Sequence, residues 1–190
     1  MRSTLFIRAL RSERGGAHML ATMAMLAALS VVLSRLIIPM PNIATRYSLE
    51  AVPIILAGLL FGPIPGALVA FVEDLVGCLF NGYGYNPILA VSPMLIGAFC
   101  GALRWLLWQK RTFLRTFLSA LPGFVLGSVL WQSYWLAALY GRNTFSYYLL
   151  SRSLQFAVTS VLDALLAFLI LRSSAFSSLG LWPPKDVDIS

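Results

Sequence analysis

The sequence predicts an all-α integral membrane protein, a six-transmembrane-helix bundle with both termini in the cytoplasm. Of the 190 residues, 59% are hydrophobic and only 11% are charged, and the mean hydropathy is +0.82. Since a soluble domain carries about 25% charged residues, this composition places the chain in lipid. Several apolar runs reach the length of about 18 residues expected of a transmembrane helix. At roughly 25–30 residues for each span and its connection, the chain has room for about six spans.

Breaks that contain proline, glycine or basic residues separate six apolar segments. The first segment ends where the prolines of residues 39–41 cannot continue a helix. The basic N-terminal segment resembles the start of a signal peptide, but the apolar run after it is too long for one, so we expect a retained first span. The second and third segments are divided by GPIPG, residues 62–66. The expected spans are residues 18–38, 48–61, 67–80, 88–108, 117–140 and 147–171.

The basic residues predict the orientation of these spans. An even number of spans brings both termini to one side, and the positive-inside rule makes the side richer in Lys and Arg cytoplasmic. That side holds Arg2, Arg8, Arg11, Arg14, Lys110, Arg111, Arg115, Arg172 and Lys185. We therefore expect a basic cytoplasmic segment (residues 1–17), a membrane domain (18–172) and a cytoplasmic tail (173–190). The net charge of +7 does not indicate nucleic-acid binding, because the basic residues gather beside apolar runs and not along one face.

The sequence argues against an enzyme. The single histidine, His18, lies at the cytoplasmic end of the first span, whereas an intramembrane serine protease needs a Ser–His pair within the bilayer. A metalloenzyme needs a cluster of His or Cys, and Cys78 and Cys100 fall in separate apolar runs, where they are expected to pack as small core residues. There is no Walker-type glycine loop, so no metal or cofactor is expected on this chain.

Arginine and aromatic residues predict a binding site at the outer end. The cations expected there are all Arg, whose fork suits carboxylate or phosphate groups. Aromatic and amide side chains in the same half could stack a planar heterocycle and pair with its edge. Snorkelling arginines and an interfacial aromatic belt are the alternatives. The candidate substrate-binding residues are Arg35, Arg46, Tyr85, Asn86, Trp131, Arg152 and Gln155.

Small residues form a stripe on the first span. Ala21, Ala24 and Ala28 are spaced so that they share one helix face. In lipid, such a stripe lets the backbone of another helix approach closely. The stripe therefore predicts either a contact with another protein or ordinary packing within the bundle.

Acidic residues lie inside two of the predicted spans. Asp74 is about 12 Å into the membrane from Gly66 at 1.5 Å per residue, and Asp163 is expected at a similar depth in the last span. Ionisable groups at such positions are costly, and we interpret both as structural or coupling residues and not as substrate ligands. Glu73 points about 100° away from Asp74 on the helix, and the sequence assigns it no role.

These features resemble a family of vitamin transporters. The stretch RYSLEAVPIILAGLLFGPIPGALVAFVEDLVG (residues 46–77), together with Arg35 before it and GYGYNP (82–87) after it, resembles the substrate-binding S components of energy-coupling factor (ECF) transporters, the folate family above all. The resemblance covers about residues 19–105, whereas the last two spans match in hydropathy and length only. Glu73 departs from the family pattern.

The resemblance implies a vitamin-capturing subunit, without its own ATPase, in the plasma membrane of a prokaryote. Such a subunit docks on a transmembrane coupling protein joined to two cytoplasmic ATPases, which use the ATP. Ala24 and Ala28 match the family's contact with the coupling protein, and the loops around residues 41–46 and 81–86 would gate the cavity. Folate fits, because its pterin ring can stack and its glutamate tail carries carboxylates for arginine. The alternatives are an S component for a different heterocyclic nutrient and a structural membrane protein without a ligand.

Overall fold

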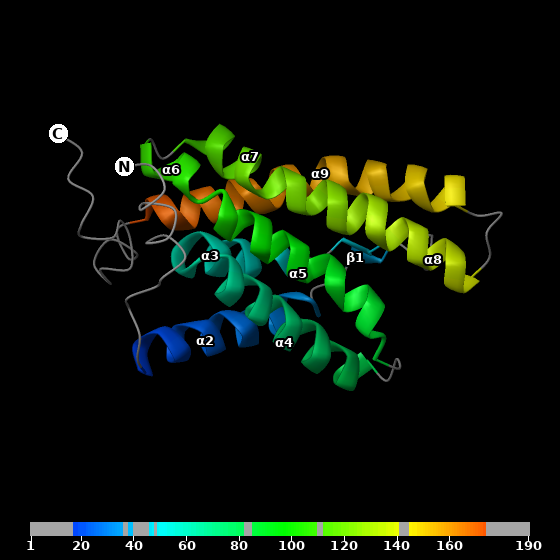
Figure 1. The fold of residues 1–190 in the computed structure, drawn as a ribbon, viewed down its shortest axis with the longest axis horizontal. Coiled ribbons are helices and arrows are strands. Elements are labelled where there is room, and N and C mark those ends of the chain that lie inside the picture. Colours follow the sequence, from blue (N-terminus) through cyan, green and yellow to red (C-terminus); the bar gives the residue numbers. More distant parts are fainter. Residues whose placement is uncertain are drawn as a thin grey trace.

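The computed structural model describes residues 17–35, 38–39, 46–47, 49–81, 85–109, 112–140 and 145–173. Apart from one short strand pair, these residues form helices packed into a bundle (Figure 1). The strands β1 (Ile38–Pro39) and β2 (Arg46–Tyr47) pair antiparallel. The helices are α2 (Ala17–Leu33), α3 (Ala51–Phe61), α4 (Pro63–Asn81), α5 (Pro87–Ala102), α6 (Trp105–Gln109), α7 (Phe113–Gly123), the π-helix η1 (Phe124–Trp131), α8 (Gln132–Tyr140) and α9 (Phe145–Arg172).

The bundle has two distinct ends. The first turn of α2 and the last turn of α9 lie at one end, at the left in Figure 1, which we call the proximal end. At the opposite, distal end α4 finishes and α5 begins, and α8 finishes and α9 begins. The strand pair lies in the distal half, where β2 contacts α9.

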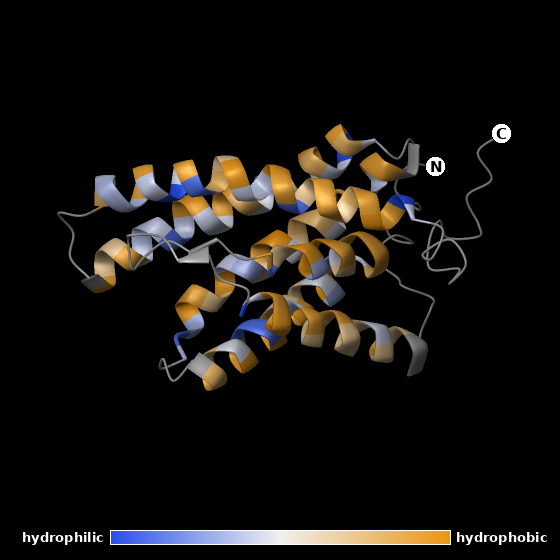
Figure 2. Ribbon diagram, turned by 180° about the vertical axis from the view of Figure 1, so that it is seen from behind, coloured by the Kyte–Doolittle hydropathy of each residue, from blue (hydrophilic) through white to orange (hydrophobic). Residues whose placement is uncertain are grey.

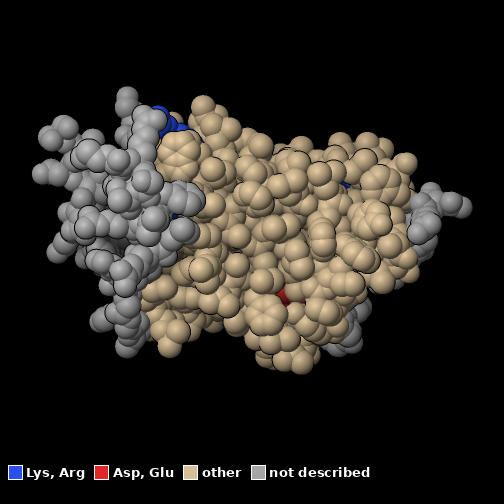
Figure 3. Space-filling view, viewed as in Figure 1, with Lys and Arg blue, Asp and Glu red and all other residues tan. Residues whose placement is uncertain are grey.

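Length and composition make the fold that of a membrane protein. Within the described residues, three helical stretches are long and apolar enough to cross a bilayer, and α2, α3 and α5 are shorter apolar helices. Leu68, Leu130 and Leu154 are 48–64% exposed on the outer surface, as expected of side chains that face lipid. Hydrophilic turns occur in the distal half of otherwise apolar helices (Figure 2). The visible face in Figure 3 carries very few charged atoms.

Several boundaries differ from the sequence prediction. The first helix ends at Leu33 and not near residue 38, because residues 38–39 enter a strand. The predicted fourth span divides into α5 and α6, and the predicted fifth begins at Phe113 instead of residue 117. The six-span count remains a prediction, because α3 has only 11 residues. At 1.5 Å per residue α3 is about 16 Å long, roughly half the thickness of the hydrocarbon core.

The turn between α3 and α4 is a single glycine. Gly62 has φ 109°, a conformation that side chains with a Cβ rarely adopt. Helix α4 begins immediately afterwards at Pro63, four residues earlier than predicted. This start is possible because a proline in the first helical turn lacks only an N–H that would have no partner within the helix. The GPIPG sequence is therefore one turn residue followed by the first turn of a helix.

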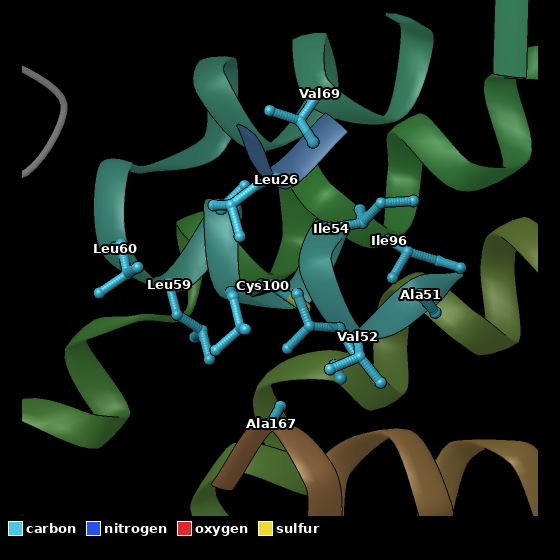
Figure 4. Close-up of a cluster of buried hydrophobic side chains, with 14 of the residues drawn as sticks. Leu26, Ala51, Val52, Ile54, Leu59, Leu60, Val69, Ile96, Cys100 and Ala167 are labelled. Carbon is cyan, nitrogen blue, oxygen red and sulfur yellow. The ribbon is translucent and has the colours of Figure 1, made fainter. Parts of the chain in front are cut away.

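Helix α3 is the centre of the core. Every one of its residues is buried, and its apolar sequence has no polar face that could meet water. Side chains of α2, α4, α5 and α9 surround it, including Leu26, Val69, Cys100 and Ala167 (Figure 4). The short second span is therefore an internal helix around which the others pack.

Glycines bring α3, α4 and α5 into backbone contact. A Cβ atom on Gly58 would lie 2.5 Å from the carbonyl oxygen of Gly97, and one on Gly66 would lie 2.6 Å from the same oxygen. A Cβ on Gly101 would overlap the backbone of Gly62 and Pro63. Since lipid provides no hydrophobic force between helices, such close packing is what holds them together. Gly123 and Gly127 make similar contacts between α7–η1 and α5.

Gly97→Ala is expected to destabilise the bundle. Its Cβ would overlap the backbone of Gly66, and overpacking a tight contact costs about 1–3 kcal/mol. The measurement is the thermal unfolding midpoint of the detergent-purified protein. Gly77→Ala is the matched control, because it also adds a methyl within a helix but meets only Glu73 Oε1 at 3.7 Å. Equal midpoints for the two variants would contradict the role of the glycine contact.

Candidate functional site

A hydrogen-bonded network joins three helices in the distal half. Arg152 of α9 donates from Nη1 to Oε1 of Gln132 on α8 at 2.8 Å. Ser92 of α5 donates from Oγ to the same oxygen at 3.2 Å. Ser92 is 2% exposed, and Arg152 is half-buried. Arg152 therefore reaches into the bundle, unlike the snorkelling arginine that the sequence left as an alternative.

Two tryptophans adjoin this network. The π-helix η1 ends at Trp131, directly before Gln132, and such π segments are frequent at functional sites. The Trp131 indole donates to the carbonyl oxygen of Ile88 at 2.8 Å, and its ring centroid lies 5.9 Å from that of Trp135. Among the described residues, the buried Nε1 of Trp135 has no hydrogen-bond partner. The indole N–H of Trp135 is thus a donor that could hydrogen-bond to an acceptor atom of a ligand.

Arg35 contacts the last turns of α4. Its Nη2 donates to the carbonyl oxygen of Gly77 at 3.2 Å, and its guanidinium carbon lies 5.5 Å from the ring centroid of Phe80, within cation–π range. Glu73 is 5% exposed, and its Oε1 also approaches Gly77. The acid to which the sequence assigned no role therefore faces the bundle interior near Arg35.

Asp74 lies beside Tyr85. The Tyr85 ring meets Phe71 edge-on, with centroids 6.5 Å apart. Removal from water, then the negative charges of Asp74 and Cys78, raise the pKa of Tyr85 above its ordinary value. We expected Asp74 to be structural and apart from the outer pocket, whereas its charge acts on Tyr85, one of the candidate binding residues.

The three remaining candidate binding residues are Asn86, Gln155 and Arg46. Asn86 caps α5, because its Oδ1 accepts from the backbone N–H of Ile88 at 3.1 Å, a structural role. Gln155 is half-buried on α9, one turn from Arg152. The backbone of Arg46 forms β2, but its side chain lies outside the described residues, as does most of the two predicted gating loops.

A second polar cluster lies deeper in the bundle. Asp163 and Ser160 on α9 are each 1% exposed, and Glu50 directly precedes α3. Glu50 and Asp163 are brought toward each other by the packing of α9 against α3. Glu50 Oε2, Asp163 Oδ1 and Ser160 Oγ are buried and have no hydrogen-bond partner among the described residues. We call these three residues the acid cluster.

The alanine stripe lies on the surface of the chain. Ala21, Ala24 and Ala28 are all exposed, whereas the neighbouring Ala27 is buried. The alternative that the stripe packs within this chain is therefore wrong. Its contact with another protein stays a prediction.

Sequence reasoning omitted Gln132, Ser92, Trp135 and Glu50 from the candidate residues. Gln132 and Trp135 belong to the aromatic and amide set of the outer half, but nothing in the sequence showed that Gln132 is the acceptor shared by Arg152 and Ser92. Ser92 carries no local pattern that would have selected it, whereas Glu50 lies in the stretch of residues 46–77 on which the family resemblance rests. Only the packing of distant segments brings them to the site.

Comparisons with known proteins give the family. A family model described as the substrate-specific component of ECF transporters matches residues 18–171, and no curated protein sequence matches the chain. A structure of FolT bound with folic acid is similar with a TM-score of 0.67 and 26% identity, covering 82% of this chain and 93% of that one.

Two further solved structures share the fold. The S component of a bacterial ECF transporter has a TM-score of 0.62 at 22% identity, covering 85% of this chain and 97% of that one. ThiT from Listeria monocytogenes has a TM-score of 0.61 at 17% identity, covering 86% and 96%. These two likenesses show the fold, and the family model, which spans residues 18–171, shows that the chain belongs to the family of substrate-specific S components of ECF transporters.

Proposed function

We propose that this S component captures folate, or a closely related pterin carboxylate, from outside the cell. The observation that carries the proposal is the likeness to FolT bound with folic acid, which extends over 82% of this chain at 26% identity. The distal half would be the outer end of the protein, with the proximal end in the cytoplasm. This orientation agrees with the concentration of basic residues near the proximal helix ends.

The distal residues have the chemistry that folate requires. The pterin ring is flat and can stack on an indole. Trp131 and Trp135, whose rings are tilted by 56° with centroids 5.9 Å apart, are the indoles available for this stacking. The glutamate tail carries two carboxylates, which suit the forked guanidinium groups of Arg152 and Arg35. Gln155 and the Trp135 indole N–H could hydrogen-bond to the polar atoms between these ends.

Delivery would depend on partner proteins. We propose that the chain docks through Ala21, Ala24 and Ala28 on a transmembrane coupling protein joined to two ATPases. ATP would be used by those partners, and this chain would bind no cofactor. The exposed stripe supports this assignment, since small side chains on a lipid-facing helix allow a partner helix to approach closely.

Arg152→Ala is expected to weaken folate binding by about 2–5 kcal/mol, the cost of leaving a buried carboxylate without its partner. Calorimetric titration of folate into the purified protein measures this effect. Arg152→Lys is the matched variant, because it keeps the positive charge but loses the forked guanidinium group. Its affinity for folate should fall between that of the unaltered protein and that of Arg152→Ala. An unchanged dissociation constant in a folded Arg152→Ala variant would remove this residue from the site, and failure of the unaltered protein to bind folate would refute the proposed substrate.

Ala24→Trp is expected to abolish uptake by the assembled transporter while folate binding to the isolated chain stays intact. The indole would hold the partner helix away from the stripe. Leu29→Trp is the control, because Leu29 is 47% exposed on α2 but lies away from the stripe, so transport should persist. Uptake in cells and calorimetry on the purified chain separate the two effects. Loss of binding in Ala24→Trp as well would show that the stripe is needed for folding.

A further inference from the structure

A polar stripe follows α9 from the distal half into the bundle. Arg152, Gln155, Thr159 and Asp163 are three or four residues apart, so they share one helix face. Other residues of α9 are exposed and apolar, among them Leu154, Val158 and Leu165. Asp163 lies 11 residues beyond Arg152, which corresponds to about 16 Å along the helix axis. The stripe thus has a cation near one end and an acid at the other.

Side-chain oxygens of the acid cluster, at the inner end, lack hydrogen-bond partners among the described residues. Thr159 uses its hydroxyl on the Gln155 carbonyl oxygen at 3.1 Å, but Ser160 Oγ, Asp163 Oδ1 and Glu50 Oε2 have no hydrogen-bond partner among the described residues. Burying a polar group without a partner is costly, and burying a charge far more so. The buried acceptors of Glu50 and of Asp163, which is 1% exposed, therefore leave positions that a proton on one carboxyl group or the donors of a bound molecule would satisfy.

Neighbouring elements fix the position of the cluster. The Ser30 hydroxyl of α2 donates to the backbone oxygen of Glu50 at 2.6 Å, and Ser30 is fully buried. Glu50 directly precedes the short internal helix α3. Asp163 and Ser160 approach from α9, which packs against α3. The backbone segments that carry the two carboxyl groups are therefore fixed by the core.

We propose that Glu50, Asp163 and Ser160 form the inner end of the ligand site and bind the donor edge of a nitrogen heterocycle. The ligand would carry a ring N–H beside an exocyclic amine, which together donate two parallel hydrogen bonds to one carboxylate. The second carboxyl group can retain a proton and donate in turn, which relieves the repulsion between the two acids. This inference rests on the proposed function and orients the ligand: the heterocycle lies inward, and the carboxylate tail points outward to Arg152.

Three probes test the orientation by calorimetry on the purified full chain: folate, 6-hydroxymethylpterin as the heterocycle alone, and 4-aminobenzoylglutamate as the tail alone. Asp163→Asn presents an amide NH₂ toward the donor edge. It should weaken folate and the heterocycle about 10- to 100-fold, the loss expected of charge-assisted hydrogen bonds, and leave the tail fragment unchanged. Glu50→Gln should also weaken the binding of folate and of the heterocycle. Arg152→Ala should instead weaken folate and the tail fragment.

Ser119→Ala is the control for removing a buried polar group, because its hydroxyl bonds within α7 to the Thr116 oxygen; it should alter no affinity. If Asp163→Asn and Glu50→Gln bind folate as tightly as the unaltered chain does, the acid cluster is structural and the inference fails, while the proposed substrate stands. If the unaltered chain binds 6-hydroxymethylpterin but not folate, and the two variants weaken that binding, the proposed substrate fails and the inner site stands. Binding of none of the probes overturns both.

Discussion

The close contact of three helix backbones at glycine residues is the constraint on which the rest of the structure depends. Gly58, Gly66 and Gly97 leave no room for side chains between α3, α4 and α5. Because lipid tails are as apolar as the side chains, apolar character alone cannot hold these helices together. Close packing can, and it is possible here only because Gly62 turns the chain within a single residue between α3 and α4.

This tight packing has consequences for the distal half. Helix α3 is short and fully buried, and Glu50, directly before it, has its Oε2 buried in the bundle. Gly127 draws η1 against α5 at the level of Ser92, which allows Ser92, Gln132 and Arg152 to share one hydrogen-bonded oxygen. Helices packed at the glycines thus hold the distal polar residues in fixed positions, a form of preorganisation that lowers the cost of binding.

Much of this arrangement follows from sequence. Hydropathy located the six apolar segments, and the breaks at proline and glycine separated them. The positions of Arg152 and Trp131 in one half also followed from the order of the spans. The alanine spacing gave the face of α2 that proves to be exposed. Such features are local, because each depends on helical periodicity or on residues that end a helix.

The rest depends on contacts between distant segments. An internal helix such as α3 is as apolar as a spanning one, so hydropathy predicted its short length but could not show that it is central and fully buried. The π-helix before Gln132 has no local pattern that announces it. Adjacent acids differ by about 100° on a helix, and only packing decided that Glu73 faces inward while Asp74 lies beside Tyr85. Hydrogen bonds such as that of Arg152 to Gln132 join residues 20 positions apart.

The most direct test of the proposed function is mass spectrometry of small molecules that co-purify with the full chain from cells supplied with mixed vitamins. Capture of folate by a preorganised site predicts that a folate or another pterin carboxylate is enriched in the wild-type protein and lost from Arg152→Ala. Enrichment of an unrelated molecule, or of none, would contradict it.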